Sequence, residues 1–172
     1  MNILSFDAES NGLHGEAFAI GAVVVDRSGR EVNSFAARCP VSADVDPWVA
    51  ENVIPALSDL QPTHTTAREM RDAFWAWLQA HKARCLVVAD CGWPVEAGLL
   101  SACVGDDPSR AFSGPYPLHE VATLLLAAGM DPLATYDELC PPCAWPKHDP
   151  RRDALQSAAC AVAALNKIWG SP

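Results

Sequence analysis

The sequence predicts an α/β fold in which one mixed β-sheet is covered by helices. The first observation is a set of three strand-like segments near the amino terminus, separated by short polar turns. The second is the change, after residue 41, to helix-like segments that alternate with a buried strand. A length of 172 residues, with 50% hydrophobic and 19% charged side chains, is typical of one globular domain. We therefore expect a single domain over residues 1–172.

The amino-terminal segments predict an antiparallel meander. A short apolar run covers Asn2–Phe6, a longer and increasingly β-branched run covers Ala17–Val25, and apolar and polar residues alternate over Glu31–Arg38. The turn Asp26–Gly29 is short enough to join the second and third segments as a hairpin. The first strand is expected to end at Asp7.

Helix and strand signals continue along the rest of the chain. The strongest lies over Thr66–His81, where Thr66 and Glu69 form a capping box ahead of apolar residues at helical spacing. A short buried strand is expected at Cys85–Ala89. Capping and proline signals predict further helices at Pro47–Leu57, Pro94–Cys103, Leu118–Gly129 and Asp153–Trp169.

Charge and hydropathy exclude two classes of protein. Twelve Lys and Arg against 21 Asp and Glu give a net charge of −9, which repels long polyanions and argues against a scaffold for duplex nucleic acid. The longest apolar stretch is far shorter than a bilayer span, and residues 1–7 lack the basic start of a signal peptide. We therefore expect a cytoplasmic protein with no membrane partner, in which the seven cysteines are reduced.

A pair of carboxylates marks the end of the first predicted strand. Asp7 and Glu9 are two positions apart, and alternate residues of a strand point to the same face, so the two side chains converge. Adjacent carboxylates repel each other unless a cation lies between them, and hard divalent cations prefer oxygen ligands. The pair therefore predicts a site for Mg²⁺ or Mn²⁺.

A second polar signal lies near the carboxyl terminus. His148 is placed in a loop, and Asp153 is expected to open the last helix. A carboxylate at a helix N-terminus and an imidazole in the preceding loop can reach one site. Asp-x-Glu in the first strand followed by His-x-x-x-x-Asp at the last helix is much rarer by chance than either pair alone.

In these features the sequence resembles the DEDDh class of 3′–5′ exonucleases, which have a ribonuclease-H-like fold and include ribonuclease T and oligoribonuclease. The resemblance covers nearly the whole chain. The segment Phe6-Asp-Ala-Glu-Ser-Asn-Gly-Leu13 is similar to the first motif, commonly Phe-Asp-Thr-Glu-Thr-Thr-Gly-Leu, and His148 and Asp153 match the third. The implied fold is a mixed five-stranded sheet with strands 1–3 as an antiparallel meander and helices on both faces.

The middle motif departs from that pattern. The usual His-Asn-x-x-Phe-Asp is replaced by Ala89-Asp-Cys-Gly-Trp-Pro-Val-Glu-Ala-Gly-Leu-Leu100. Asp90 has the expected residue type and ends the strand, so we favour it as the metal ligand. Glu96 lies four residues before Leu100, as in oligoribonuclease-like members, and is the alternative ligand or a supporting residue.

The resemblance implies hydrolysis of phosphodiesters at the 3′ end of single-stranded RNA or DNA, with release of nucleoside 5′-monophosphates. Two Mg²⁺ or Mn²⁺ ions would activate water and stabilise the leaving oxygen. Asp7 would bridge both ions, with Glu9, Asp153 and the middle acid completing their coordination. His148 would act as general base, since an imidazole titrates near neutral pH. The acidic balance favours short strands.

The loop after the first strand is expected to hold the terminal nucleotide. Its backbone amides would face the terminal hydroxyl, and Leu13 would contact the base. The residues of this loop are Ser10, Asn11, Gly12 and Leu13. Arg151 and Arg152 are candidates for a phosphate contact. Ser10 and Asn11 replace the usual threonine pair, so a preference for RNA or DNA stays open, and the resemblance allows a homodimer.

Two other interpretations remain open. The altered middle motif is compatible with a ribonuclease-H-like module that binds nucleic acid or protein and has lost its activity. The segment Cys140-Pro-Pro-Cys143, with His148 five residues further on, suggests a zinc site or a redox-active thiol pair. A single Cys-x-x-Cys without a second pair is a weak signal for either.

Overall fold

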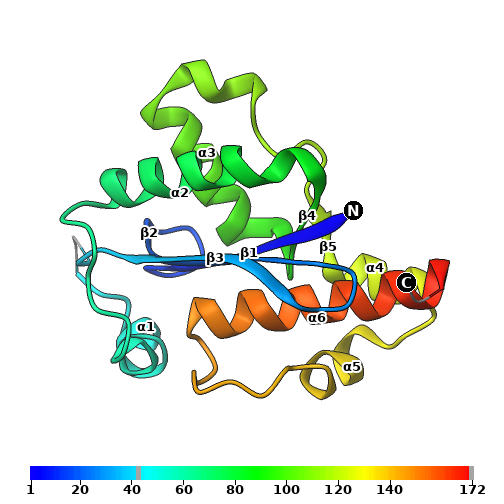
Figure 1. The fold of residues 1–172 in the computed structure, drawn as a ribbon. Coiled ribbons are helices and arrows are strands. Elements are labelled where there is room, and N and C mark those ends of the chain that lie inside the picture. The colour runs from blue at the N-terminus through cyan, green and yellow to red at the C-terminus, as the bar shows by residue number, and fades with distance from the viewer. Residues whose placement is uncertain (42–43, 171–172) are drawn as a thin grey trace.

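A computed structural model, which describes residues 1–41 and 44–170, contains a five-stranded sheet in the order β3-β2-β1-β4-β5 (Figure 1). The strands β1, β2 and β3 pair antiparallel, and β4 and β5 extend the sheet parallel to β1. Their bounds are Asn2–Ser10, Ala17–Val25, Glu31–Arg38, Cys85–Ala89 and His119–Glu120. The mixed five-stranded α/β sheet predicted from the sequence is confirmed.

Helices cover both faces of this sheet (Figure 1). One apolar cluster joins α2 and α3 to the face that carries Leu4 and Phe6, and the other joins α4 and α6 to the face that carries Ile3 and Val88. The helices are α1 Pro47–Asn52, α2 Ala67–His81, α3 Ala97–Asp106, α4 Val121–Ala127, α5 Pro132–Glu138 and α6 Pro150–Trp169. Of the described helices, not one combines the length and apolar character needed to cross a membrane.

Several predicted elements are confirmed with their local causes. Thr66 accepts a hydrogen bond from the Glu69 amide and the Glu69 side chain reaches back, so α2 begins at the expected capping box. Strand β4 has the predicted bounds. The backbone of Gly129 is left-handed (φ 66°) directly after α4, where a glycine ends a helix at least cost.

Other boundaries differ from the predictions. Strand β1 does not end at Asp7 but continues to Ser10, because β2 supplies pairing partners along this whole length. The segment predicted as one helix over Leu118–Gly129 begins with the two residues of β5, which pair with the end of β4. The segment Pro47–Leu57 consists of α1 and a separate helical turn at Ile54–Leu57.

Candidate active site

Strand β1 places its two acidic residues on the face that α6 covers. Leu4 and Phe6 belong to the cluster under α2 and α3, whereas Ile3 belongs to the cluster under α6. Because side chains alternate along a strand, Asp7 and Glu9 lie on the same face as Ile3. A register shift between Glu9 and Ser10 ends the regular pairing with β2 just beyond the pair.

The amino terminus of α6 is fixed by a buried cap. Asp149 is wholly buried, and its carboxylate accepts a hydrogen bond from the Arg151 amide (3.0 Å) and a 2.6 Å ion pair from the Arg151 guanidinium. Pro150 follows at the first helical position, where a missing amide proton costs nothing. The prediction that Asp153 opens the helix is therefore wrong. Asp153 lies within the first turn of α6.

A glycine lets this helix terminus approach the sheet closely. Gly21 on β2 is the register partner of Asp7 on β1. A Cβ atom at Gly21 would lie 2.2 Å from the carbonyl carbon and oxygen of Pro150 and 2.5 Å from the Arg151 amide nitrogen. Any larger residue would push the start of α6 away. The absence of a side chain at Gly21 thus brings Asp153 and the preceding loop beside Asp7.

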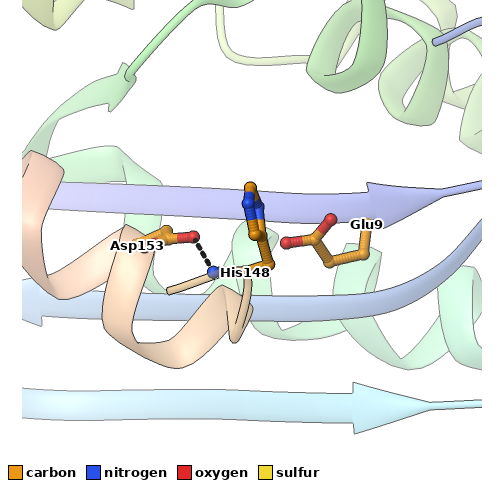
Figure 2. Close-up of side chains that lie close together, drawn as sticks. All are labelled: Glu9, His148 and Asp153. Carbon is orange, nitrogen blue, oxygen red and sulfur yellow. Dashed lines mark hydrogen bonds between the residues drawn. The ribbon is translucent and has the colours of Figure 1, made fainter. Parts of the chain in front are cut away.

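The loop before α6 presents His148 to the two carboxylates. His148 has a left-handed backbone (φ 67°), and its amide donates to Asp153 Oδ2 at 3.0 Å. Figure 2 shows the carboxylates of Glu9 and Asp153 on either side of His148. Ligand atoms of these three residues lie within 4.8 Å of one another, and within the described ranges they are the only group of this kind. The edge of the Trp48 ring contacts the imidazole, with centroids 5.4 Å apart.

The structure places both candidates for the middle acid near the pair on β1. Asp90, directly after β4, lines the same cavity as Asp7, Glu9 and Asp153. Glu96 is only 7% exposed, and its carboxylate accepts a hydrogen bond from the backbone of Ala8, between the two acids of β1. Glu96 comes from the helical turn Gly92–Glu96, which precedes α3.

Burial of these acids in one place shifts their titration strongly. Burial, followed by the charge of Glu9, raises the pKa of Asp7 well above its ordinary value. Burial and the charge of Asp153 raise the pKa of Glu9 to about 8, and burial raises the pKa of Glu96 to about 7. The pKa of Asp153 is also raised by burial, although Arg152 and His148 oppose the shift. The cluster is thus costly to ionise on its own.

The chemistry of this donor set fits a hard divalent cation. The side chains offer carboxylate oxygens from β1, from the end of β4, from the turn before α3 and from α6, together with one imidazole. Mg²⁺ and Mn²⁺ prefer such ligands, and a bound cation would offset the mutual repulsion of the carboxylates. Arg152 offsets part of this negative charge, because its guanidinium lies 3.1 Å from Asp153 Oδ1.

The loop after β1 is built from its own hydrogen bonds. The Ser10 hydroxyl donates to the carbonyl of Gly12 (2.7 Å), where the backbone turns through a positive φ of 78°. The Asn11 amide group donates to the carbonyl of Asp44 and accepts from the amide of Asp46. The side chain of Asn11 therefore holds two loops together.

Beyond this loop lies a cavity of about 500 Å³ that opens onto the acids. Leu13, which is 68% exposed, lines it together with Ser10 and Gly12. The opposite wall includes Trp48 and Val49 from α1. Sequence analysis missed Trp48, whose only local signal is its place directly after the helix-capping Asp46 and Pro47.

The two arginines predicted to meet phosphate have internal partners. Arg151 pairs with the buried Asp149 and stacks on the Trp145 ring at 4.8 Å, so it stabilises the start of α6. Arg152 lies at the acid cluster but is paired with Asp153.

The cysteine pair lies apart from the acids. Cys140 and Cys143 are both free, partly buried thiols. Their Sγ atoms donate weakly to the carbonyls of Pro141 and Trp145. Within residues 1–41 and 44–170, they form no ligand cluster with His148.

Comparison with known proteins identifies the fold. No protein-family model matches the sequence, and no curated protein is similar to it in sequence. Among solved structures, exonuclease X in complex with 5′-overhanging duplex DNA matches with a TM-score of 0.57 and 18% identity, over 95% of this chain and 91% of that one. A 3′-exonuclease that recognises the 3′ end of the histone mRNA stem-loop matches with a TM-score of 0.55 and 11% identity, over 96% and 81%.

A third match is the zinc-bound complex of Escherichia coli ExoI with single-stranded DNA, with a TM-score of 0.58 and 14% identity. It covers 97% of this chain but 40% of that chain. At these identities the matches establish the fold alone: the chain shares its mixed five-stranded α/β architecture with these solved exonucleases.

Proposed function

We propose that the protein is a metal-dependent 3′–5′ exonuclease that shortens single-stranded RNA or DNA and releases nucleoside 5′-monophosphates. The observation that carries this proposal is the convergence of five carboxylates and one imidazole beside the carboxyl ends of β1 and β4, in a sheet like that of the matched exonucleases. These side chains are Asp7, Glu9, Asp90, Glu96, Asp153 and His148. A structural role does not explain why so many partly or fully buried carboxylates lie close together, because their repulsion opposes folding.

Two Mg²⁺ or Mn²⁺ ions, held by the carboxylates of β1, α6 and the middle acid, would supply Lewis-acid activation of water and stabilise the leaving oxygen. For the middle acid we favour Glu96, because its burial and its hydrogen bond to Ala8 hold it between Asp7 and Glu9. Asp90 lines the same cavity and would support the site from the end of β4.

The protein's own residues position the substrate and move the proton. The terminal nucleotide would lie in the cavity between Leu13 and Trp48, with its 5′ phosphate directed at Glu9 and His148. His148 would accept a proton from the attacking water. A new P–O bond then forms to the water oxygen, and the bond to the 3′-oxygen of the penultimate nucleotide breaks.

The test is release of nucleoside 5′-monophosphate from a short single strand in Mn²⁺ or Mg²⁺, followed by mass spectrometry. We expect release by the wild type, none in EDTA, and at least a hundredfold loss in Asp7→Ala and His148→Ala. Gly105→Ala serves as the control variant, because a Cβ there meets no other atom within 4 Å. No release with either metal would contradict the proposal and favour a module that only binds nucleic acid or protein.

A further inference from the structure

The protein has twelve cationic side chains, and most of those in the described structure donate to other protein groups. Arginine and lysine groups contact phosphate most readily where their donors are not already engaged by protein oxygens. In the described structure, ten of the twelve donate to a carboxylate, a side-chain amide or a backbone carbonyl. These ten are Arg27, Arg30, Arg38, Arg68, Arg71, Lys82, Arg110, Arg151, Arg152 and Lys167.

The two remaining cations occupy very different places. Within residues 1–41 and 44–170, Arg84 and Lys147 have no hydrogen bond or ion pair from their charged ends. Arg84 is exposed just before β4, and since β1 and β4 are parallel, it lies at the end of the sheet opposite Asp7 and Asp90. Lys147 is exposed directly before His148 and lines the cavity that contains the acids.

The cavity that Lys147 lines is separate from the one assigned to the terminal nucleotide. It measures about 410 Å³ and runs from Asp7 and Asp90 towards α4 and α5. The two cavities share Ala8, Glu9 and His148, whereas Leu13 and Trp48 line only one and Lys147 only the other. A strand that ends between Leu13 and Trp48 and enters this second cavity past the acids would run beside Lys147.

The far wall of this second cavity has the character that a nucleobase requires. It contains the exposed Ala122 and Leu133, the latter 91% exposed, in front of the fully buried Leu125. Apolar surface of this kind is suited to a base, while the backbone phosphate needs a cation. Among the described residues that line this cavity, Lys147 is the one lysine or arginine.

We propose that Lys147 binds the phosphate on the 5′ side of the penultimate nucleotide, whose base lies against Ala122 and Leu133. This inference rests on the proposed exonuclease function. The unit that the site recognises is then two nucleotides, together with the phosphate that joins them and the phosphate on their 5′ side. The Lys147 contact also explains how a protein of net charge −9 holds an anionic strand beside buried carboxylates.

The experiment neutralises that phosphate in the substrate and the lysine in the protein. The first cut in a 5′-labelled hexanucleotide is timed for strands with a methylphosphonate at the second or the third linkage from the 3′ end. We expect Lys147→Ala to raise KM about tenfold or more on the unmodified strand, as expected for loss of one charged hydrogen bond. The kcat should stay within about twofold, and Lys147→Arg should restore the KM.

The linkage dependence is the decisive readout. The increase in KM caused by Lys147→Ala should disappear when the second linkage is already neutral, and it should persist when the third linkage is neutral. The slope of log KM against log salt should fall by about 0.7, the contribution of one phosphate contact to a single strand. Arg84→Ala removes the same charge away from the cavity and should leave KM unchanged.

An increase in KM that is equal on all three strands, or an unchanged KM in Lys147→Ala, would overturn the inference. Fluorescence anisotropy of the same labelled strands in Ca²⁺ measures binding without relying on cleavage. It therefore separates failure of the Lys147 contact from failure of the proposed function. Linkage-dependent binding without any cleavage would contradict the exonuclease and support the Lys147 contact. Cleavage that ignores the second linkage would support the exonuclease and contradict the Lys147 contact.

Discussion

Replacement of Gly21 by alanine tests how the sheet and α6 assemble the site. The new Cβ would lie 2.2 Å from backbone atoms of Pro150, whereas ordinary contacts begin at 3.4 Å, so the start of α6 must move by about 1.2 Å. Asp153 and His148 would move with it, away from Asp7. A displacement of about 1 Å between catalytic groups can cost on the order of a hundredfold in rate.

The same substitution has a smaller effect on stability. Overpacking a well-packed contact costs about 1–3 kcal/mol, which leaves most of the protein folded at 25 °C. The assay is the rate of the first cut in a 5′-labelled hexanucleotide at saturating strand and Mn²⁺, beside circular dichroism and thermal unfolding. Gly105→Ala, in open space on α3, should keep the wild-type rate. A folded Gly21→Ala variant with wild-type activity would refute the claim that this close approach sets the geometry.

Three further predictions concern the acids and Trp48. In EDTA the folded protein should lose stability as pH rises from 5 to 8, because the pKa of Glu9 is raised from 4.5 to about 8 and the folded state holds protons that the unfolded state releases. For the same reason Asp7→Asn should raise Tm in EDTA at pH 8, and Mn²⁺ should raise the Tm of the wild type more than that of the variant. Glu96→Gln should reduce kcat at least tenfold more than Asp90→Asn, because Glu96 is the more buried acid and lies beside Ala8. Trp48→Ala should lower kcat/KM about three- to tenfold through loss of its edge contact to His148, and Trp48→Phe should recover part of it.

Each of these predictions has a contradicting result. A metal-free Tm that rises between pH 5 and 8, or an Asp7→Asn variant less stable than the wild type in EDTA, would show that the acids do not repel one another in the folded state. Equal reductions of kcat in Asp90→Asn and Glu96→Gln would assign the role of the middle acid to both residues. A Trp48→Ala variant with wild-type kcat/KM would show that His148 is held without the ring.

The sequence predicted the parts of the fold that depend on local patterns. The meander followed from apolar runs and a tight turn, and α2 followed from the capping box of Thr66 and Glu69. Strand β5 has only two residues, too few for any periodicity, and exists because the end of β4 offers it hydrogen bonds. Its residues were therefore absorbed into the predicted helix Leu118–Gly129.

The candidate site was predictable where spacing along one element decides it. Asp7 and Glu9 share a face because strands alternate, but their distance from Asp153 depends on Gly21, which lies in an entirely apolar strand without any local signal. The contact between Trp48 and His148 joins residues that are 100 positions apart, and no spacing rule connects them. Such contacts come from register and helix placement, which the sequence encodes only through the whole fold.

The most direct test of the central claim is the polarity of strand degradation. One single strand is labelled at its 5′ end and, separately, at its 3′ end, and both are incubated with the protein in Mn²⁺. The account predicts a ladder of shortening fragments from the 5′ label and immediate appearance of labelled mononucleotide from the 3′ label. Labelled fragments of intermediate length from both ends, or labelled mononucleotide released first from the 5′ end, would contradict it.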